Sequence, residues 1–148
     1  MGDRQSSLQE AIHALGRKDF AVTRVSSMYE TAALEYTAQP DFLNCVVEAQ
    51  TELLPMRLLQ RVSGIERQMG RKRLVPKGPR VIDIDILLHG NAVVETPLLQ
   101  IPHPRMTERR FVLEPLAELA PDLRHPILRR SIRELLMAAP PQRISKLK

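Results

Sequence analysis

The sequence predicts an α+β fold in which helices pack against a mainly antiparallel sheet. Segments with helical spacing of apolar residues and segments with alternating apolar residues follow one another in the order helix, two strands, helix, strands, helices. The chain has 148 residues, of which 43% are hydrophobic and 26% charged, which is enough for one domain with its own core. We therefore expect a single domain that spans residues 1–148.

The first third of the chain is expected to form one helix and two strands. Apolar residues recur at helical spacing up to Gly16, which is a typical helix end. Residues 20–31 and 42–53 alternate enough to predict strands. The segment between them, 32–41, has no clear period and is expected to be a loop longer than a hairpin needs, and such loops are often functional.

The middle of the chain predicts a helix, a loop and a strand. Pro55 suits the first turn of a helix, because its missing N–H has no partner there, and the apolar face of this helix continues to Met69. Residues 71–80 contain prolines and a glycine and are expected to form a basic loop. Residues 81–88 are expected to form a strand.

The last third of the chain predicts short strands followed by two helices. Residues 93–102 are expected to give edge strands, whose pairing is limited by prolines. A helix that Thr107 caps and Pro115 kinks is expected next. A last helix is expected to begin near Ser131 and to stop before Pro140.

Composition excludes several classes of protein. No apolar run reaches the roughly 20 residues that cross a bilayer, and the polar N-terminus is not a signal peptide. Cys45 is the only cysteine, which excludes an internal disulfide framework and a cysteine-rich metal site, so we expect a cytoplasmic protein. The net charge of +5 and pI near 9.9 favour a polyanionic partner: nucleic acid, nucleotide phosphates or an anionic membrane.

Two aspartates interrupt the apolar strand predicted over residues 81–88. Strand alternation places Asp83 and Asp85 on the face opposite to the isoleucines, about 7 Å apart along the backbone. Two negative charges this close destabilise one another and raise the pKa of one carboxyl group, and a divalent cation such as Mg²⁺, which takes oxygen ligands, removes the conflict. The alternative is that both side chains are simply solvated on an exposed face of the sheet.

A run of basic residues leads directly into this strand. From Arg67 to Arg80, both included, the chain has six basic residues and no acidic one. Arginine presents a fork of donors that suits phosphate oxygens, so a basic loop beside two carboxylates is a plausible metal–polyphosphate site. The alternative is a solvated basic surface. The glycine-rich sequence of P-loop enzymes is absent from the chain.

Five stretches of the chain resemble one family in the same order. They are SSMYETAALE, QPDFLNCVVEAQTELLP, IERQMGRKR, GPRVIDIDILLHG and IPHPRMTERRFVLEPLAELAP. Together they resemble 6-hydroxymethyl-7,8-dihydropterin pyrophosphokinase of the folate pathway. The resemblance implies a ferredoxin-like α/β sandwich that transfers pyrophosphate from ATP to a reduced pterin with two Mg²⁺ ions. It also implies a monomer that acts on small molecules, without a nucleic-acid or membrane partner.

The resemblance further implies a role for individual residues. Metal binding falls on Asp83 and Asp85, and catalysis on Arg71 and Arg80. The ATP contacts fall on Glu66, Arg73, Lys77, His103 and Arg109. The pterin contacts, with two aromatic rings stacked on the pterin, fall on Thr31, Leu34, Phe42, Asn44 and Phe111. An arginine that the family has near Lys77 is absent here, so that phosphate contact is either lost or taken over by Lys77.

The chain departs from the family at its start. Family members carry a hydrophobic strand before the segment that matches Asp3 and Arg4, and this strand is interior in the ferredoxin-like core. We therefore expect the fold to lack this first strand, which leaves neighbouring strands with unpaired backbone groups. Restoring about a dozen apolar residues upstream is then expected to raise the melting temperature and the activity.

Two further interpretations stay open at this point. A relative that lacks the first strand could bind nucleotide or pterin without turning over. A basic nucleic-acid-binding module also fits the charge, although aromatic residues make up only 3% of the chain, too few for a typical surface that stacks single strands.

Overall fold

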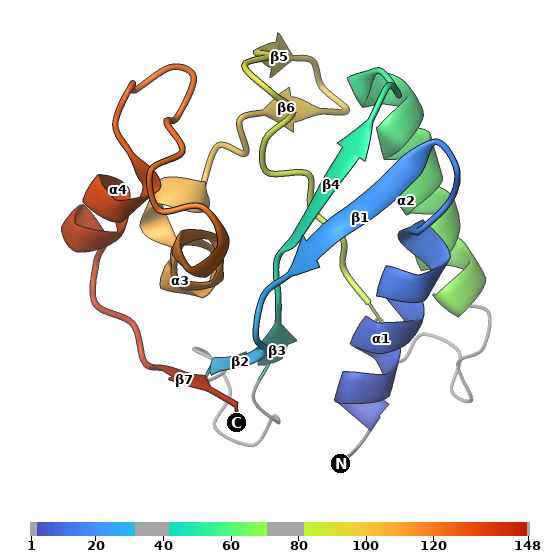
Figure 1. The fold of residues 1–148 in the computed structure, drawn as a ribbon, viewed down its shortest axis with the longest axis horizontal. Helices are drawn as coiled ribbons and strands as arrows, with labels where there is room; N and C mark the ends of the chain where they lie inside the picture. The colour runs from blue at the N-terminus through green and yellow to red at the C-terminus, as the bar shows by residue number, and fades with distance from the viewer. Residues whose placement is uncertain (1–2, 32–41, 71–81, 148) are drawn as a thin grey trace.

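The computed structural model describes residues 3–31, 42–70 and 82–147, and it has the expected α+β class. Helices α1 and α2 lie on one side of the strands β1 and β4, and α3 and α4 lie on the other side (Figure 1). The helices are α1 Asp3–Leu15, α2 Pro55–Gly70, the 3₁₀ helix η1 Met106–Glu108, α3 Arg110–Leu119 and α4 Ile132–Ala138. The strands are β1 Phe20–Val25, β2 Tyr29–Thr31, β3 Phe42–Asn44, β4 Val47–Thr51, β5 Val94–Glu95, β6 Gln100–Ile101 and β7 Ile144–Lys146.

Every strand pair in the described residues is antiparallel, as predicted. The strands form a two-stranded sheet β1–β4, a three-stranded sheet β3–β2–β7 and a two-stranded sheet β5–β6. Each of the two long strands predicted over residues 20–31 and 42–53 is divided into two short ones. The chain bends between them because the Ser26 hydroxyl accepts the backbone N–H of Val46 at 2.8 Å, while the Ser26 N–H donates to the Val46 carbonyl.

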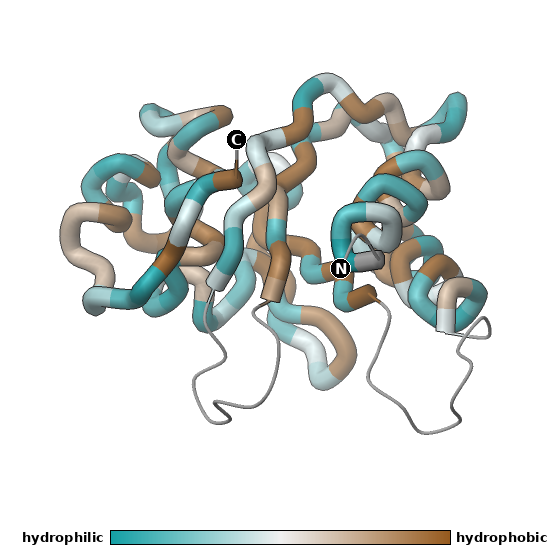
Figure 2. The backbone as a smooth tube through the Cα atoms, turned by 90° about the horizontal axis from the view of Figure 1, so that it is seen from below, coloured by the Kyte–Doolittle hydropathy of each residue, from teal (hydrophilic) through white to brown (hydrophobic). Residues whose placement is uncertain are grey.

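The helices α1 and α2 pack beside each other against the β1–β4 sheet. Figure 2 shows hydrophobic and hydrophilic residues alternating along both helices, as the sequence spacing predicts. One face of α2 is buried through Leu58, Val62, Ile65 and Met69. These side chains form a core cluster with residues of α1, Phe20 and Ile82. The first two predicted helices are therefore confirmed.

A second core cluster joins α3 and α4. Met106, Leu113 and Ile132 are fully buried within it. The predicted start of α4 is confirmed, because the Ser131 hydroxyl accepts the Glu134 N–H at 3.1 Å and the Glu134 carboxylate accepts the Ser131 N–H at 2.9 Å. This reciprocal pair is a capping box, which satisfies two otherwise unpaired donors at a helix start.

The predicted start of α3 is wrong. Thr107 lies inside the 3₁₀ helix η1 and caps nothing, whereas Arg109 precedes the first residue of α3. The Arg109 N–H bonds to the Met106 carbonyl at 3.3 Å, which closes a tight turn before the α-helical spacing begins. Strand β7 was also not predicted, since three residues carry too little alternation to indicate a strand.

The strand predicted over residues 81–88 is wrong within the described part, residues 82–88. These residues belong to no sheet of the described structure. A strand needs a neighbour to pair with, but residues 82–90 and β4 both line a cavity of about 570 Å³, and none of the described strands pairs with residues 82–88.

Candidate active site

Residues 82–86 present their side chains to opposite sides, as the sequence alternation predicts. Ile82 is buried, and Ile84 and Ile86 pack against the first core cluster. Asp83 and Asp85 are both exposed. The apolar side chains thus fix the segment to the core while both carboxylates stay accessible, even though none of the described strands pairs with its backbone.

A side chain from α2 holds this aspartate segment in place. Glu66 Oε2 accepts a hydrogen bond from the Ile84 backbone N–H at 2.7 Å, and Ile84 lies between the two aspartates. Glu66 is the only acidic residue in α2, and this was the one feature of the sequence that set it apart from the rest of the helix. Sequence reasoning assigned Glu66 to ATP and missed its contact with the backbone. The ATP contact stays a prediction.

His103 lies close to the aspartate segment. Its backbone N–H donates to the Leu87 carbonyl at 2.9 Å, and its ring Nδ1 accepts the Arg105 N–H at 3.2 Å. Burial lowers the pKa of His103, the charge of Asp85 acts in the opposite direction, and Arg109 and Arg105 lower the pKa further. A cavity of about 270 Å³ is lined by both Asp85 and His103. The structure therefore brings together residues that the sequence assigned to metal and to ATP.

The residues predicted to hold a pterin come from two separate elements. Phe42 begins β3 and is 55% exposed, and its backbone pairs with Thr31 of β2. Thr31 is buried, and its hydroxyl oxygen has no hydrogen-bond partner among the described residues. Such an orphaned group costs about 1–3 kcal/mol, so it favours a polar ligand or neighbour at this point. Phe111 belongs to the first turn of α3, and the Arg109 guanidinium lies 5.5 Å from its ring centroid.

One cavity connects the two groups of candidate residues. The 570 Å³ cavity is lined by Asn44 and Phe111 as well as by Asp83 and Asp85. Phe42 and Thr31 lie on the neighbouring strands and do not line it. Two predicted pterin contacts and both predicted metal ligands therefore share one recess.

Five of the predicted site residues lie outside the described residues: Leu34, Arg71, Arg73, Lys77 and Arg80. Among the described residues, no group of three or more histidine, cysteine, aspartate or glutamate side chains is arranged to hold a metal ion. Two accessible carboxylates nevertheless fit Mg²⁺, which commonly takes one or two protein carboxylates and completes its shell with phosphates and water. In the described helices, none is long and apolar enough to cross a membrane.

Comparison with known proteins identifies the family. Residues 1–121 match the family described as 7,8-dihydro-6-hydroxymethylpterin-pyrophosphokinase (HPPK). The chain belongs to this family. The match covers all the described segments that carry candidate site residues, from β2 to the first turns of α3.

Several named proteins are similar to this HPPK-family chain. A 2-amino-4-hydroxy-6-hydroxymethyldihydropteridine pyrophosphokinase of Bacillus subtilis is 48% identical over 120 residues, which is 80% of this chain and 72% of that protein. A protein of the same name from Aquifex aeolicus is 41% identical over 134 residues, 90% of this chain and 83% of that protein. The "Folic acid synthesis protein fol1" of Schizosaccharomyces pombe is 41% identical over 97% of this chain, which spans only 20% of that longer protein.

Proposed function

We propose that this chain transfers the pyrophosphoryl group of ATP to the hydroxymethyl group of 6-hydroxymethyl-7,8-dihydropterin, which forms AMP and the pterin diphosphate. The names of the two bacterial relatives support this reaction, because this chain aligns with most of the length of each of them. The observation that carries the proposal is the shared cavity, in which Asp83, Asp85, Asn44 and Phe111 meet. Such a recess can place a nucleotide's phosphates beside a flat heterocycle.

Asp83 and Asp85 are the residues that would hold Mg²⁺, two ions in this proposal. Both side chains are exposed, and their oxygen donors suit a hard cation. When bound, the metal neutralises phosphate charge and aligns the phosphates for transfer. Glu66 keeps the two carboxylates at a fixed place by holding the Ile84 N–H between them.

In this proposal, His103 beside Asp85 and Arg109 at the start of α3 position the nucleotide phosphates. His103 is partly buried beside Asp85, and burial lowers the pKa of its imidazole, which favours the neutral ring. A neutral ring donates one hydrogen bond to a phosphate oxygen without adding charge. Arg109 adds a guanidinium at the start of α3. Arg73 and Lys77 are proposed to contribute further phosphate contacts, and Arg71 and Arg80 to stabilise the transferring group.

The pterin is placed between two aromatic rings, Phe42 from β3 and Phe111 from α3. Flat heterocycles stack favourably on such rings, and Asn44 can exchange hydrogen bonds with the polar edge of the pterin. The backbone at Thr31 and Leu34 completes this half of the site in the proposal. The pterin hydroxyl then attacks the β-phosphorus of ATP in line, the bond from the β-phosphorus to the oxygen that bridges it to the α-phosphorus breaks to release AMP, and the hydroxyl proton passes to solvent. Transfers of this type depend mainly on positioning and charge, so no dedicated general base is required.

The test is AMP release with ATP, Mg²⁺ and the reduced pterin. The unchanged chain is expected to form AMP only when the pterin is present. Replacement of both aspartates, Asp83→Ala with Asp85→Ala, is expected to lower kcat at least about a thousandfold, because the metal has lost its protein ligands. Activity that survives this double replacement contradicts the proposed site. Pterin binding without any AMP identifies instead a relative that binds but does not turn over. Light scattering during gel filtration checks the proposed monomer.

A further inference from the structure

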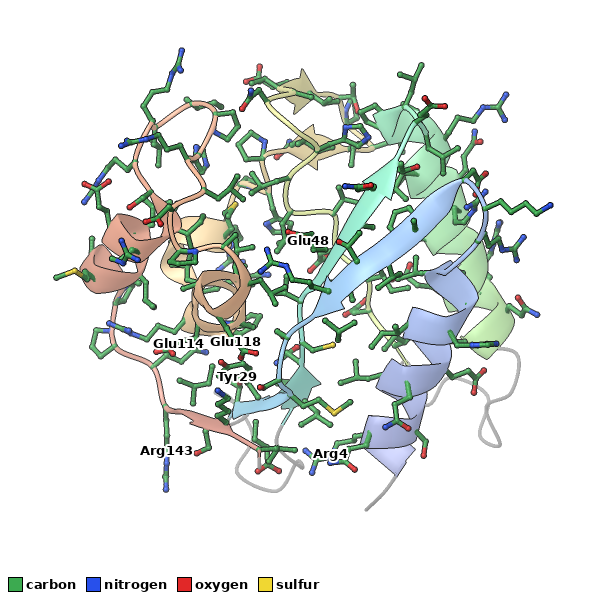
Figure 3. The ribbon with its side chains drawn as sticks, viewed as in Figure 1. Arg4, Tyr29, Glu48, Glu114, Glu118 and Arg143 are labelled. Carbon is green, nitrogen blue, oxygen red and sulfur yellow. The ribbon has the colours of Figure 1, made fainter. Side chains whose placement is uncertain are left out.

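We infer that Glu118 and Tyr29 are positioning residues that set the distance between the two aromatic halves of the pterin site. The inference rests on the proposed function, because it concerns how Phe42 and Phe111 are held for the same pterin. Neither residue lines the cavities described above. Both lie behind the site, at the junction between α3 and β2 (Figure 3).

Glu118 links α3 to β2 through several hydrogen bonds. The Tyr29 hydroxyl donates to Glu118 Oε1 at 2.6 Å. The Ser27 backbone N–H and the Ser27 hydroxyl both donate to Oε2, at 2.9 and 3.1 Å. Lys146 of β7 adds a charge, with its Nζ 3.8 Å from Oε1. Both carboxylate oxygens thus accept hydrogen bonds, and their donors are Ser27, just before β2, and Tyr29, the first residue of β2.

The electrostatics of this junction favour the ionised carboxylate. Burial acts to raise the pKa of Glu118, but the hydrogen bonds from Tyr29 and Ser27 outweigh it, and the net pKa is lowered. Burial and the hydrogen bond to Glu118 both raise the pKa of Tyr29. At neutral pH the pair is therefore a phenol that donates to a carboxylate, which is a strong, charge-assisted hydrogen bond.

Each residue of this pair lies in or beside the element that carries one of the aromatic rings. Tyr29 is buried in β2 and pairs with Asn44, and two residues further along β2, Thr31 pairs with Phe42. Glu118 lies seven residues after Phe111 on α3, about 10 Å along the helix axis. The helix between them is fixed by the fully buried Leu113. A shift of β2 relative to α3 therefore changes the distance between the two elements that position the rings.

A role in positioning differs from a role in stability alone. Loss of the link would let the rings separate and weaken pterin binding. His103 and the aspartate segment serve the nucleotide, and no described hydrogen bond joins them to Tyr29 or Glu118, so ATP binding should not change. The Michaelis constants for the two substrates therefore separate the two roles. A general loss of stability does not raise one constant and spare the other.

The experiment compares Tyr29→Phe and Glu118→Gln with the unchanged chain. Tyr29→Phe keeps the buried ring and removes only the hydroxyl. Both variants are expected to raise the KM for the pterin roughly tenfold, as expected for loss of a charge-assisted hydrogen bond, and to change the KM for ATP less than about twofold. Pterin dissociation constants, measured by calorimetry with a non-hydrolysable ATP analogue, are expected to rise by the same factor.

Two control variants belong to the same part of the molecule. Asp122→Asn removes an exposed carboxylate that pairs with Arg133 at 2.7 Å, and Ile132→Val removes one methylene from the core that α3 and α4 share. Both are expected to leave the pterin KM unchanged, although Ile132→Val lowers the melting temperature. An unchanged pterin KM and dissociation constant in Tyr29→Phe and Glu118→Gln overturn the inference. If the unchanged chain binds pterin but releases no AMP, the proposed reaction fails, and the dissociation constants still decide this inference.

Discussion

The hydrogen bond from Ile84 to Glu66 allows a quantitative test of how the aspartate segment is held. We consider the replacement Glu66→Ala. It removes a carboxylate whose Oε2 lies 2.7 Å from a partly buried backbone N–H. In the described structure residues 82–88 belong to no sheet, so sheet hydrogen bonds cannot take over this role.

The expected magnitude follows from the type of bond. A hydrogen bond to a charged group contributes about 1.5–3 kcal/mol, and partial solvent access reduces this to roughly 1–2 kcal/mol for Glu66→Ala. In a domain of this size, each kcal/mol shifts the melting temperature by about 2–4 °C. Without this hydrogen bond the two aspartates are less well oriented. The Mg²⁺ concentration that gives half-maximal activity is therefore expected to rise about tenfold to a hundredfold, which is the usual effect of losing a residue that orients metal ligands.

Two measurements check this prediction. Thermal unfolding gives the stability change, and AMP release as a function of Mg²⁺ concentration gives the activation constant. Glu66→Gln keeps an acceptor oxygen without the charge, so its effects should lie between those of the unchanged chain and of Glu66→Ala. Glu52→Ala, which removes an exposed glutamate just before α2, is the matched control and should change neither quantity. If Glu66→Ala shows the unchanged melting temperature and Mg²⁺ dependence, the reasoning about this segment is refuted.

Two further predictions concern the α3–α4 region. Burial lowers the pKa of His125 below its ordinary 6.5, and its Nδ1 accepts the N–H groups of Ile127 and Leu128. Below pH 6.5 the unfolded chain therefore binds more protons at His125 than the folded chain does, so the free energy of unfolding should fall as the pH decreases from 6.5 to the folded-state pKa. His125→Asn should remove this part of the pH dependence, measured by urea unfolding. Ser131→Ala, which breaks the capping box with Glu134, should cost about 1 kcal/mol in the same assay, and an unchanged midpoint would contradict the capping argument.

Local patterns in the sequence were sufficient to predict the structural features that depend on residues close together in the chain. The buried face of α2 was expected from helical spacing, and the start of α4 from Ser131. The alternation that exposes Asp83 and Asp85 while Ile82 is buried was also expected. In each case the side chains that decide the outcome lie within a few residues of one another, so their spacing is already visible in the sequence.

The tertiary structure decided the features that depend on residues far apart in the chain. Alternation over residues 82–88 indicated a strand, but a strand needs a partner, and a cavity occupies the place beside β4. The contact of Glu66 with Ile84 joins residues 18 apart, and that of Tyr29 with Glu118 joins residues 89 apart. No local periodicity encodes such pairs, because they exist only once separate elements have packed against each other.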